Sequence, residues 1–341
     1  MNPSERLPQP ASAALDLTKL KMRSRAARAH KVSLERLGKP TAAGASFADW
    51  YANLPGFLGA SELRAAVRGV VAARRSGKPV LFAFGGHIVK TGCSPLVIDL
   101  MERGIITALA TNGSGAIHDL ELAETGETSE EVADTIRDGS FGMVNETCER
   151  MNAAARDGRS VGLGRALGNL LWKGDAAHRE LSLFAAAARL NIPATVHVAI
   201  GTDTVHMHPA ADGAALGEAT LADFRTFCQV VAAMGEPASA ASAGAASAGA
   251  GPKTGGAFLN FGSAVIMPEV FLKAVSIARN LGYDLDGMRT ANFDMLRHYR
   301  PAQNVVSRPV KAGHGNAVTG HHEILLPLFR QAIVEEVSRR E

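Results

Sequence analysis

The sequence predicts an α/β protein with a single large domain around a doubly wound, mostly parallel sheet, and two observations carry this prediction. First, the apolar runs 80–84 and 105–110 each lead into a glycine-rich turn that opens a helix. Second, strand-like and helix-like patterns alternate along most of the chain, which is typical of a parallel sheet with helices on both faces.

The expected elements follow one another in order. Residues 1–50 contain Pro, Ser, Ala and scattered basic residues without a strand pattern, so we expect an arm there and the domain over 51–341. The helix expected around 96–101 is too uniformly apolar for a surface helix and should be buried. Other helices are expected over 61–75, 178–190, 221–234, 268–281 and after residue 320, and other strands over 194–200, 257–261 and 291–294.

Composition places the chain among globular proteins of the cytoplasm. It has 341 residues, of which 46% are hydrophobic, and a formal net charge of only +3, so no nucleic-acid partner is required. Its 3 cysteines are far apart in the sequence and fit a reducing compartment rather than a disulfide framework. The polar amino end and the lack of a long apolar run predict neither a signal peptide nor a membrane partner.

Two further segments stand out. Between residues 236 and 256 the composition reduces to Ala, Ser, Gly and Pro, which predicts a flexible surface insertion. The stretches FAFGGHIVK and LNFGSAVIM resemble each other, which aligns Gly85 with Gly262 and Lys90 with Met267. Two related strand-turn-helix units on one sheet explain this echo, and so does the physics that any two such units share.

The segment TNGSGAIHDLE, residues 111–121, is the first candidate for chemistry. Its glycines open a helix, and the amino end of a helix suits an anionic ligand where parallel strands end. The spacing differs from GxGxxG, so the residues indicate only an anion or a nucleotide. His118 is a candidate general acid or base whose tautomer Asp119 would hold, and a histidine that only caps a helix is the alternative.

The segment IGTDTVHMHPAADG, residues 200–213, is the second candidate. It gathers Asp203, His206, His208 and Asp212 in one polar loop after a strand. Alternate residues of an extended segment point the same way, so His206 and His208 are able to share a metal, with the range 321–323 (HHE) as a further source of ligands. Because no third ligand has convincing spacing, the sequence favours an active-site loop without a metal.

Other candidates lie at the predicted strand ends. Lys90 stands at an apolar entrance to a helix, where a desolvated lysine becomes nucleophilic, and phosphate binding is the alternative. Asn260, Asn292 and Asp294 should share the same sheet edge if the strands are parallel, although helix capping explains such residues equally well.

The residues from 85 to 120 resemble the cofactor-binding half of deoxyhypusine synthase. GGHIVKTGCSP with the later HDLE is also similar to the NAD-dependent ornithine cyclodeaminases, which belong with homospermidine synthase to the same superfamily. IGTDTVHMH, LNFGSAVIM and TANFD match the synthase more loosely, in the right order over about 80–294. This resemblance implies a Rossmann-like NAD-binding fold, usually as a homotetramer with cofactor sites at subunit interfaces.

The resemblance also implies a function and a set of site residues. It implies an NAD-dependent enzyme, a transferase or cyclodeaminase, that oxidises an amine substrate to an imine, which then undergoes deamination or group transfer. His118 or His206 would move protons, Asp203 or Asp119 would hold the amine, and Lys90 is a further catalytic candidate. The residues expected to bind NAD are Gly85, Gly86, Thr91, Gly92, Thr111, Asn112, Gly113, Ser114, Gly115, Asn292 and Asp294.

One departure from the family pattern limits the transfer of function. The lysine that forms an imine in the synthase falls at Met267, and a thioether forms no imine. Two alternatives therefore stay open beside the amine-oxidising enzyme: a non-catalytic nucleotide-binding or scaffold protein of the same fold, and a metal-dependent hydrolase that uses His206 and His208.

Overall fold

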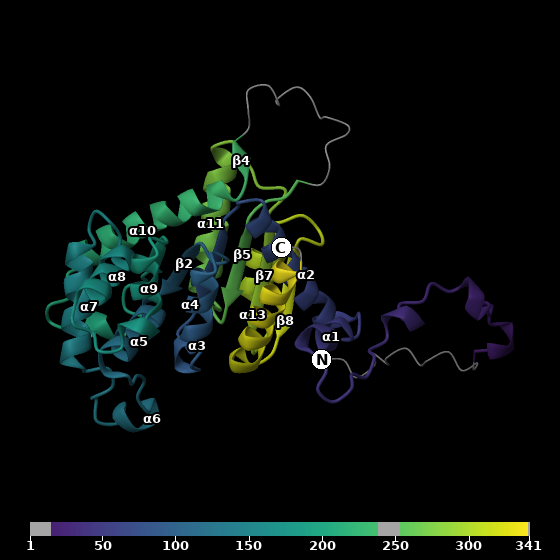
Figure 1. Ribbon diagram of the computed structural model, residues 1–341, viewed down its shortest axis with the longest axis horizontal. Coiled ribbons are helices and arrows are strands. Elements are labelled where there is room, and N and C mark those ends of the chain that lie inside the picture. Colours follow the sequence, from purple (N-terminus) through teal and green to yellow (C-terminus); the bar gives the residue numbers. More distant parts are fainter. Residues whose placement is uncertain (1–14, 238–252, 340–341) are drawn as a thin grey trace, which may run out of the picture.

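The computed structural model describes residues 15–237 and 253–339, and its centre is a sheet of 6 strands (Figure 1). All neighbouring strands of this sheet are parallel, in the order β3-β2-β1-β5-β7-β8. Since β5, β7 and β8 are its fourth, fifth and sixth strands along the chain, this is the strand order of the Rossmann fold, and the predicted fold class is confirmed. The strands are β1 (Val80–Phe84), β2 (Ala108–Asn112), β3 (Ala194–His197), β5 (Ala257–Phe261), β7 (Arg289–Asp294) and β8 (Gly315–Thr319).

Helices cover both faces of the sheet because alternate strand residues point to opposite sides. In β1, Phe82 and Phe84 belong to one core, whereas Leu81 and Ala83 belong to the other. The larger core is covered by α2 (Leu58–Arg75), α4 (Ser94–Glu102), α5 (Gly113–Thr125), α7 (Asn145–Asp157), α8 (Leu163–Lys173), α9 (Leu183–Arg189) and α13 (His322–Ser338), and the smaller core by α11 (Ile266–Asn280). The long helix α10 (Gly213–Ala233) contributes to both cores.

Short elements complete the fold. Two short antiparallel strands, β4 (Glu236–Pro237) and β6 (Tyr283–Asp284), pair beside the segment 238–252, which lies outside the described residues. The predicted flexible insertion falls mostly on that segment. The remaining elements are η1 (Leu17–Lys19), η2 (Arg25–Ala27), η3 (Leu34–Arg36), α1 (Phe47–Ala52), α3 (His87–Lys90), α6 (Val132–Thr135), η4 (Arg179–Leu181), η5 (Thr204–Met207), α12 (Tyr299–Pro301) and the π-helix η6 (Ala302–Ser307).

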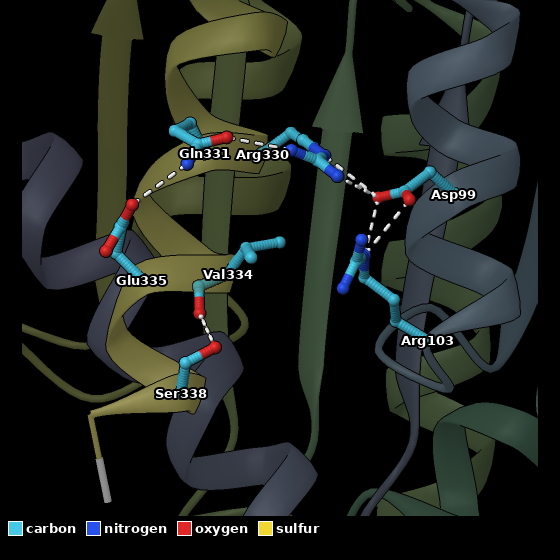
Figure 2. A network of polar contacts seen from close by, with 7 residues as sticks. All are labelled: Asp99, Arg103, Arg330, Gln331, Val334, Glu335 and Ser338. Carbon is cyan, nitrogen blue, oxygen red and sulfur yellow. Dashed lines mark hydrogen bonds and ion pairs between the residues drawn. The ribbon is translucent and has the colours of Figure 1, made fainter. Parts of the chain in front are cut away.

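A polar network joins α4 to the last helix, α13 (Figure 2). Arg330 donates to Asp99 Oδ2 from Nη2 at 2.7 Å and from Nε at 2.9 Å, and Arg103 Nε also donates to this carboxylate. Burial alone would raise the pKa of Asp99, but the hydrogen bonds from the two arginines outweigh it and lower that pKa. The contact fixes two helices that lie over the same face of the sheet.

The element predictions differ from the structure mainly around β2. Ile105 and Ile106 were expected in the strand, but their N–H groups donate to the carbonyl of Leu100 and close the end of α4. The strand therefore begins later, at Ala108, and ends at Asn112. The sequence analysis did not identify α7, α8 or β8. Among the described residues, no helix combines the length and hydropathy of a membrane span.

The amino-terminal segment lies apart from the sheet. Most side chains of residues 15–39 are exposed, and Figure 1 shows this segment extending away from the helices and strands. The first helix with a buried side chain is α1, where Tyr51 is 5% exposed. A division into an arm and a domain near residue 50 remains our proposal.

Candidate functional site

The carboxyl ends of the parallel strands define one edge of the molecule, at the bottom of Figure 1 where α3 is labelled. In this strand order the direction of winding changes between β1 and β5. Gly85 follows β1 and Gly262 follows β5, and a Cβ on Gly85 would lie 2.5 Å from the carbonyl oxygen of Gly262. Because Phe84 pairs with Phe261, the sequence echo corresponds to two neighbouring units in contact.

Two glycines allow the turns after β1 and β2 and the loop after β3 to approach one another. A Cβ on Gly86 would lie 2.5 Å from Ser114 Oγ and 3.0 Å from His118 Cδ2. A Cβ on Gly113 would collide with the carboxylate of Asp203. This carboxylate lies in front of the amino end of α5, where it disfavours a phosphate by charge repulsion.

Several predicted cofactor residues have partners inside their own turn. Thr111 Oγ1 donates to the carbonyl of Phe84 at 2.7 Å, which ties β2 to β1. Asn112 Oδ1 accepts from the N–H of Gly115 at 3.1 Å and caps α5. A Cβ on Gly115 would collide with the Thr111 hydroxyl. These contacts explain the residues structurally, and their role toward a cofactor stays a prediction.

His118 is the centre of a polar chain on α5. Its Nδ1 lies 2.8 Å from Thr128 Oγ1, and Thr128 Oγ1 donates to Glu121 Oε2 at 2.5 Å. Thr147 Oγ1 donates to the other carboxylate oxygen of Glu121 at 3.0 Å. Burial opposes ionisation of Glu121, but attraction to His118 and the two hydroxyl donors lower its pKa. The His118 side chain is 15% exposed, with its ring edge beside Gly86.

Asp119 has hydrogen-bond partners other than His118, the partner that the sequence suggested. It is 0% exposed and faces the amino end of α9, where it accepts from Ser182 Oγ at 2.6 Å and from the N–H groups of Leu183 and Phe184 at 2.7 and 3.3 Å. Burial raises its pKa to about 6 against these hydrogen bonds. Successive helix residues point about 100° apart, so Asp119 caps α9 while His118 faces Thr128.

The loop after β3 separates the two candidate metal ligands. His206 Nδ1 accepts from the N–H groups of Gly201 at 3.1 Å and Asp203 at 3.3 Å, and its Nε2 lies 3.9 Å from Asp203 Oδ2. Burial raises the pKa of Asp203, and His206 partly offsets this effect. His208 Nε2 instead lies 3.1 Å from Asn145 Oδ1. In the described part of the chain, no three His, Cys, Asp or Glu side chains are grouped to hold a metal ion.

The lysine candidate lies in water rather than in an apolar pocket. Lys90, the last residue of α3, is exposed, whereas the prediction placed its side chain in an apolar helix entrance. Beside it, Thr91 Oγ1 donates to the carbonyl of His87, and Gly92 is exposed with a φ of 72°. Met267, at the position of the family lysine, is 0% exposed within the smaller core. An amine there would be buried among apolar side chains.

The other part of the edge, at the carboxyl ends of β5, β7 and β8, contains polar side chains with atoms that lack a hydrogen-bond partner. Asn260 and Asn292 are register neighbours, and Asn260 Nδ2 donates to Asn292 Oδ1 at 2.6 Å. Asp294 lies two residues further on β7, on the same face, and its Oδ1 accepts from the N–H of Met295. His322 follows β8 and is 1% exposed. Burial lowers the pKa of His322, while Asp294 acts in the opposite direction.

Unpartnered buried polar atoms concentrate along this edge. Among the described residues, 8 buried side-chain nitrogen and oxygen atoms have no hydrogen-bond partner. Five of these atoms are at the edge: Asn260 Oδ1, Asp294 Oδ2, His206 Nε2 and both ring nitrogens of His322. Buried polar groups are normally hydrogen-bonded, so such a concentration points to a ligand that supplies the partners.

The sequence analysis placed some of these residues correctly on one edge and missed others. It grouped residues 321–323 with His206 as metal ligands, but β3 and β8 lie at opposite ends of the sheet, which separates them. It gave no role to Thr128 or Glu121, since side-chain hydrogen bonds from a loop to a helix leave no periodic signal. His322 was recognisable only as a polar residue after a strand that was itself not predicted.

The strand order and the polar carboxyl edge define a class: a Rossmann-like α/β protein with candidate ligand groups at the switch of winding. No family model matches the chain, and no curated protein does. Among solved structures, unliganded AgrE is similar in fold, with a TM-score of 0.51 and 14% sequence identity over 81% of this chain. The match covers 33% of AgrE, so this chain spans about a third of that protein.

Two further structures align less closely. ArgZ, an arginine dihydrolase of the ornithine-ammonia cycle in cyanobacteria, has a TM-score of 0.48 at 14% identity, over 83% of this chain and 34% of ArgZ. A putative deoxyhypusine synthase from Entamoeba histolytica has a TM-score of 0.43 at 11% identity, over 86% of this chain and 95% of that one. The AgrE alignment supports the Rossmann-like fold alone, and the resemblance to deoxyhypusine synthase stays a prediction.

Proposed function

We propose that this protein is an NAD-dependent enzyme that oxidises a carbon bearing an amine, with deamination or group transfer as the following step. The observation that carries the proposal is the set of five unpartnered buried polar atoms along the carboxyl edge of a Rossmann-ordered sheet. In such sheets, ligands bind at this edge where the winding changes direction.

The residues of the β5–β8 part of the edge, which are 260–263, 292–295 and 320–323, fit a dinucleotide. Asn260 Oδ1 and Asp294 Oδ2 are acceptors without donors, and ribose hydroxyls and a carboxamide supply donors. The 15-residue helix α11 begins beside Ser263 and offers its positive end to phosphates. Together with the turn at Gly85 and Gly86, these residues would hold NAD, which takes up a hydride when it is bound.

The remaining edge would then bind the substrate. Asp203 and His206 are mostly buried, with side chains 6% and 7% exposed, and a carboxylate in this position attracts an ammonium group. His118 would accept the proton that the ammonium must lose before oxidation. Because Met267 cannot form an imine, we propose that a small nucleophile such as water, rather than a lysine of this chain, attacks the oxidised substrate.

The fold neighbour supports the choice of cofactor and substrate class. AgrE has been solved as a ternary complex with ornithine and NAD+. We therefore place amino acids with a second amine, such as ornithine, first among the substrates to test. Homotetramer formation, as in the resembling family, belongs to the same proposal.

Calorimetric titration with NAD tests the cofactor directly. We expect Asp294→Asn to weaken NAD binding by about tenfold, the loss of roughly one hydrogen bond to a charged group. Asp284→Asn is the matched control, because Asp284 lies in the small two-stranded sheet, on β6, and pairs with Lys253. No binding of NAD at millimolar concentration would overturn the proposal.

Absorbance of reduced nicotinamide tests catalysis once binding is established. We expect it to rise when ornithine, lysine or another diamine is added to the protein with NAD. Bound NAD that is never reduced by any of these amines would favour the alternative of a non-catalytic nucleotide-binding protein.

A further inference from the structure

The hydrogen bonds that join His118, Thr128 and Glu121 determine which ring nitrogen of His118 carries a hydrogen. Thr128 has one hydroxyl hydrogen, and its oxygen is 2.5 Å from Glu121 Oε2 and 2.8 Å from His118 Nδ1. An ionised carboxylate can only accept hydrogen bonds, and the pKa of the Glu121 carboxyl is lowered, which favours the ionised form. Thr128 therefore donates its single hydroxyl hydrogen to Glu121 and has none left to donate to His118.

The assignment at Thr128 fixes the state of the histidine. If the Thr128 oxygen donates to Glu121, it can only accept from His118, so His118 Nδ1 carries a hydrogen. A neutral imidazole with a hydrogen on Nδ1 has its lone pair on Nε2. In the described part of the chain Nε2 has no hydrogen-bond partner, and it lies 3.5 Å from the position of a Cβ on Gly86.

Glu121 is itself held from a second side. Thr147 on α7 donates to Glu121 Oε1 at 3.0 Å, so both carboxylate oxygens have a hydroxyl donor. The Glu121 side chain is 21% exposed, and its Oε2 lies 3.9 Å from His118 Nδ1. The carboxylate is thus fixed where it attracts a positive charge on the imidazole ring.

We propose that Thr128 and Glu121 are positioning residues that keep His118 in the tautomer with a free Nε2, ready to act as the base of the site. This inference rests on the proposed function for the identity of the substrate amine. An N–H bond of the substrate ammonium breaks with its electron pair left on the amine nitrogen, a bond from that proton to Nε2 forms, and the other hydrogen stays on Nδ1, donated to Thr128 Oγ1. The resulting imidazolium is stabilised by the Glu121 carboxylate.

The tautomer is measurable without substrate or NAD. Nitrogen-15 NMR of protein labelled at histidine distinguishes a ring nitrogen that bears hydrogen from one that does not, and His118→Gln identifies the signals. At a pH where the ring is neutral, we expect Nδ1 of His118 to bear the hydrogen and Nε2 to be free. A hydrogen on Nε2 in the wild type would overturn the inference.

Variants of the two positioning residues sharpen the test. Thr128→Val removes the acceptor and should move the His118 signals toward the other tautomer, whereas Thr128→Ser should keep them in place. Thr125→Val is the matched control, because Thr125 Oγ1 donates only to the carbonyls of Glu121 and Glu127. Unchanged His118 signals in Thr128→Val would contradict a positioning role.

Activity gives a separate readout. In Thr128→Val we expect kcat for amine oxidation to fall by about 10²-fold, near the lower end of what general base catalysis contributes, with recovery in Thr128→Ser. Absence of NAD binding would overturn the proposed function and leave the tautomer result standing. If Thr128→Val shifts the His118 tautomer as expected but keeps the kcat of the wild type, the role of this tautomer in catalysis is overturned.

Discussion

The two parts of the carboxyl edge treat their polar side chains in opposite ways. In the β2–β3 part, residues 111–128 and 198–208, the buried Asp119 and the half-buried Glu121 have hydrogen-bond partners within the chain. In the β5–β8 part, Asn260, Asp294 and His322 retain free atoms although they are buried. Partnered groups hold a structure in place, whereas free buried groups cost stability and are retained where a ligand satisfies them.

The two parts of the carboxyl edge therefore have different roles. The β2–β3 part is preorganised and orients His118, and the β5–β8 part is completed only by a bound molecule. His206 is the exception, because its Nε2 is also free, and it lies where the substrate would enter from the β2–β3 side. Substitutions should therefore change stability in opposite directions in the two parts.

The largest expected effect is the loss of Asp119. Asp119→Ala leaves the Ser182 hydroxyl and two backbone N–H groups at the start of α9 without an acceptor. We expect the free energy of unfolding to fall by about 3–5 kcal/mol, since each buried unsatisfied donor costs roughly 1–3 kcal/mol. Urea unfolding measures it, and Asp119→Asn should lose less. A stable but inactive Asp119→Ala protein would instead support the catalytic role that the sequence suggested.

A smaller effect concerns pH and Asp223, which fastens β3 to α8. Its Oδ2 accepts from the N–H groups of Val196 at 2.8 Å and Gly164 at 2.9 Å, and burial raises its pKa from 3.8 to about 7. The folded chain thus holds this proton more tightly than the unfolded chain. The contribution of Asp223 to the free energy of unfolding is largest below about pH 4 and falls up to pH 7, by at most about 1.4 kcal/mol per pH unit.

Asp223→Asn isolates this contribution, because an amide oxygen can accept both N–H groups and does not titrate. We expect the difference in unfolding free energy between wild type and Asp223→Asn to change between pH 4 and pH 7 and to be constant above pH 8. Thermal or urea unfolding at a series of pH values provides the measurement. A constant difference over the whole range would show that folding does not raise the pKa of Asp223.

The smallest expected effect on stability is in the β5–β8 part and has the opposite sign. His322→Leu removes two ring nitrogens that are buried without partners, so we expect the free energy of unfolding to rise by about 1 kcal/mol while NAD affinity falls. His314→Leu is the control, because His314 lies at the amino end of β8 with its Nδ1 near the carbonyl of Met288. A large loss of stability in His322→Leu would identify His322 as a packing residue.

The sequence predicted the sheet better than the site. The strand 80–84 is a continuous apolar run and 257–261 is apolar except for Asn260, and both are fully buried, so their pattern is visible without any tertiary information. The sequence did not predict β8, because GNAVT contains no apolar run and its two buried residues, Asn316 and Val318, form only a weak alternating pattern. The apolar patterns therefore identified every strand of the central sheet except β8, which is one of its two edge strands.

The site depends on contacts between side chains that are not predicted by any local sequence pattern. Asp119 and His118 are neighbours in sequence and were interpreted as a pair, but the helix directs them to different partners. The desolvation of Lys90 was inferred from apolar neighbours, which face the core while its own side chain faces solvent. The partners of His118 came from a loop, Thr128, whose position is set by folding and not by any local pattern.

The link between Asp99 and Arg330 has a consequence for how the chain is made. The two residues are 231 positions apart, and α13 follows every strand of the sheet in the sequence, so it leaves the ribosome after them. Phe329 on this helix packs on Phe261 and Phe293, with ring centroids at 5.8 and 4.7 Å. Until α13 has been made, these aromatic rings of the nascent sheet lack the cover that Phe329 provides, so this part of the face stays open to chaperones and to other growing chains.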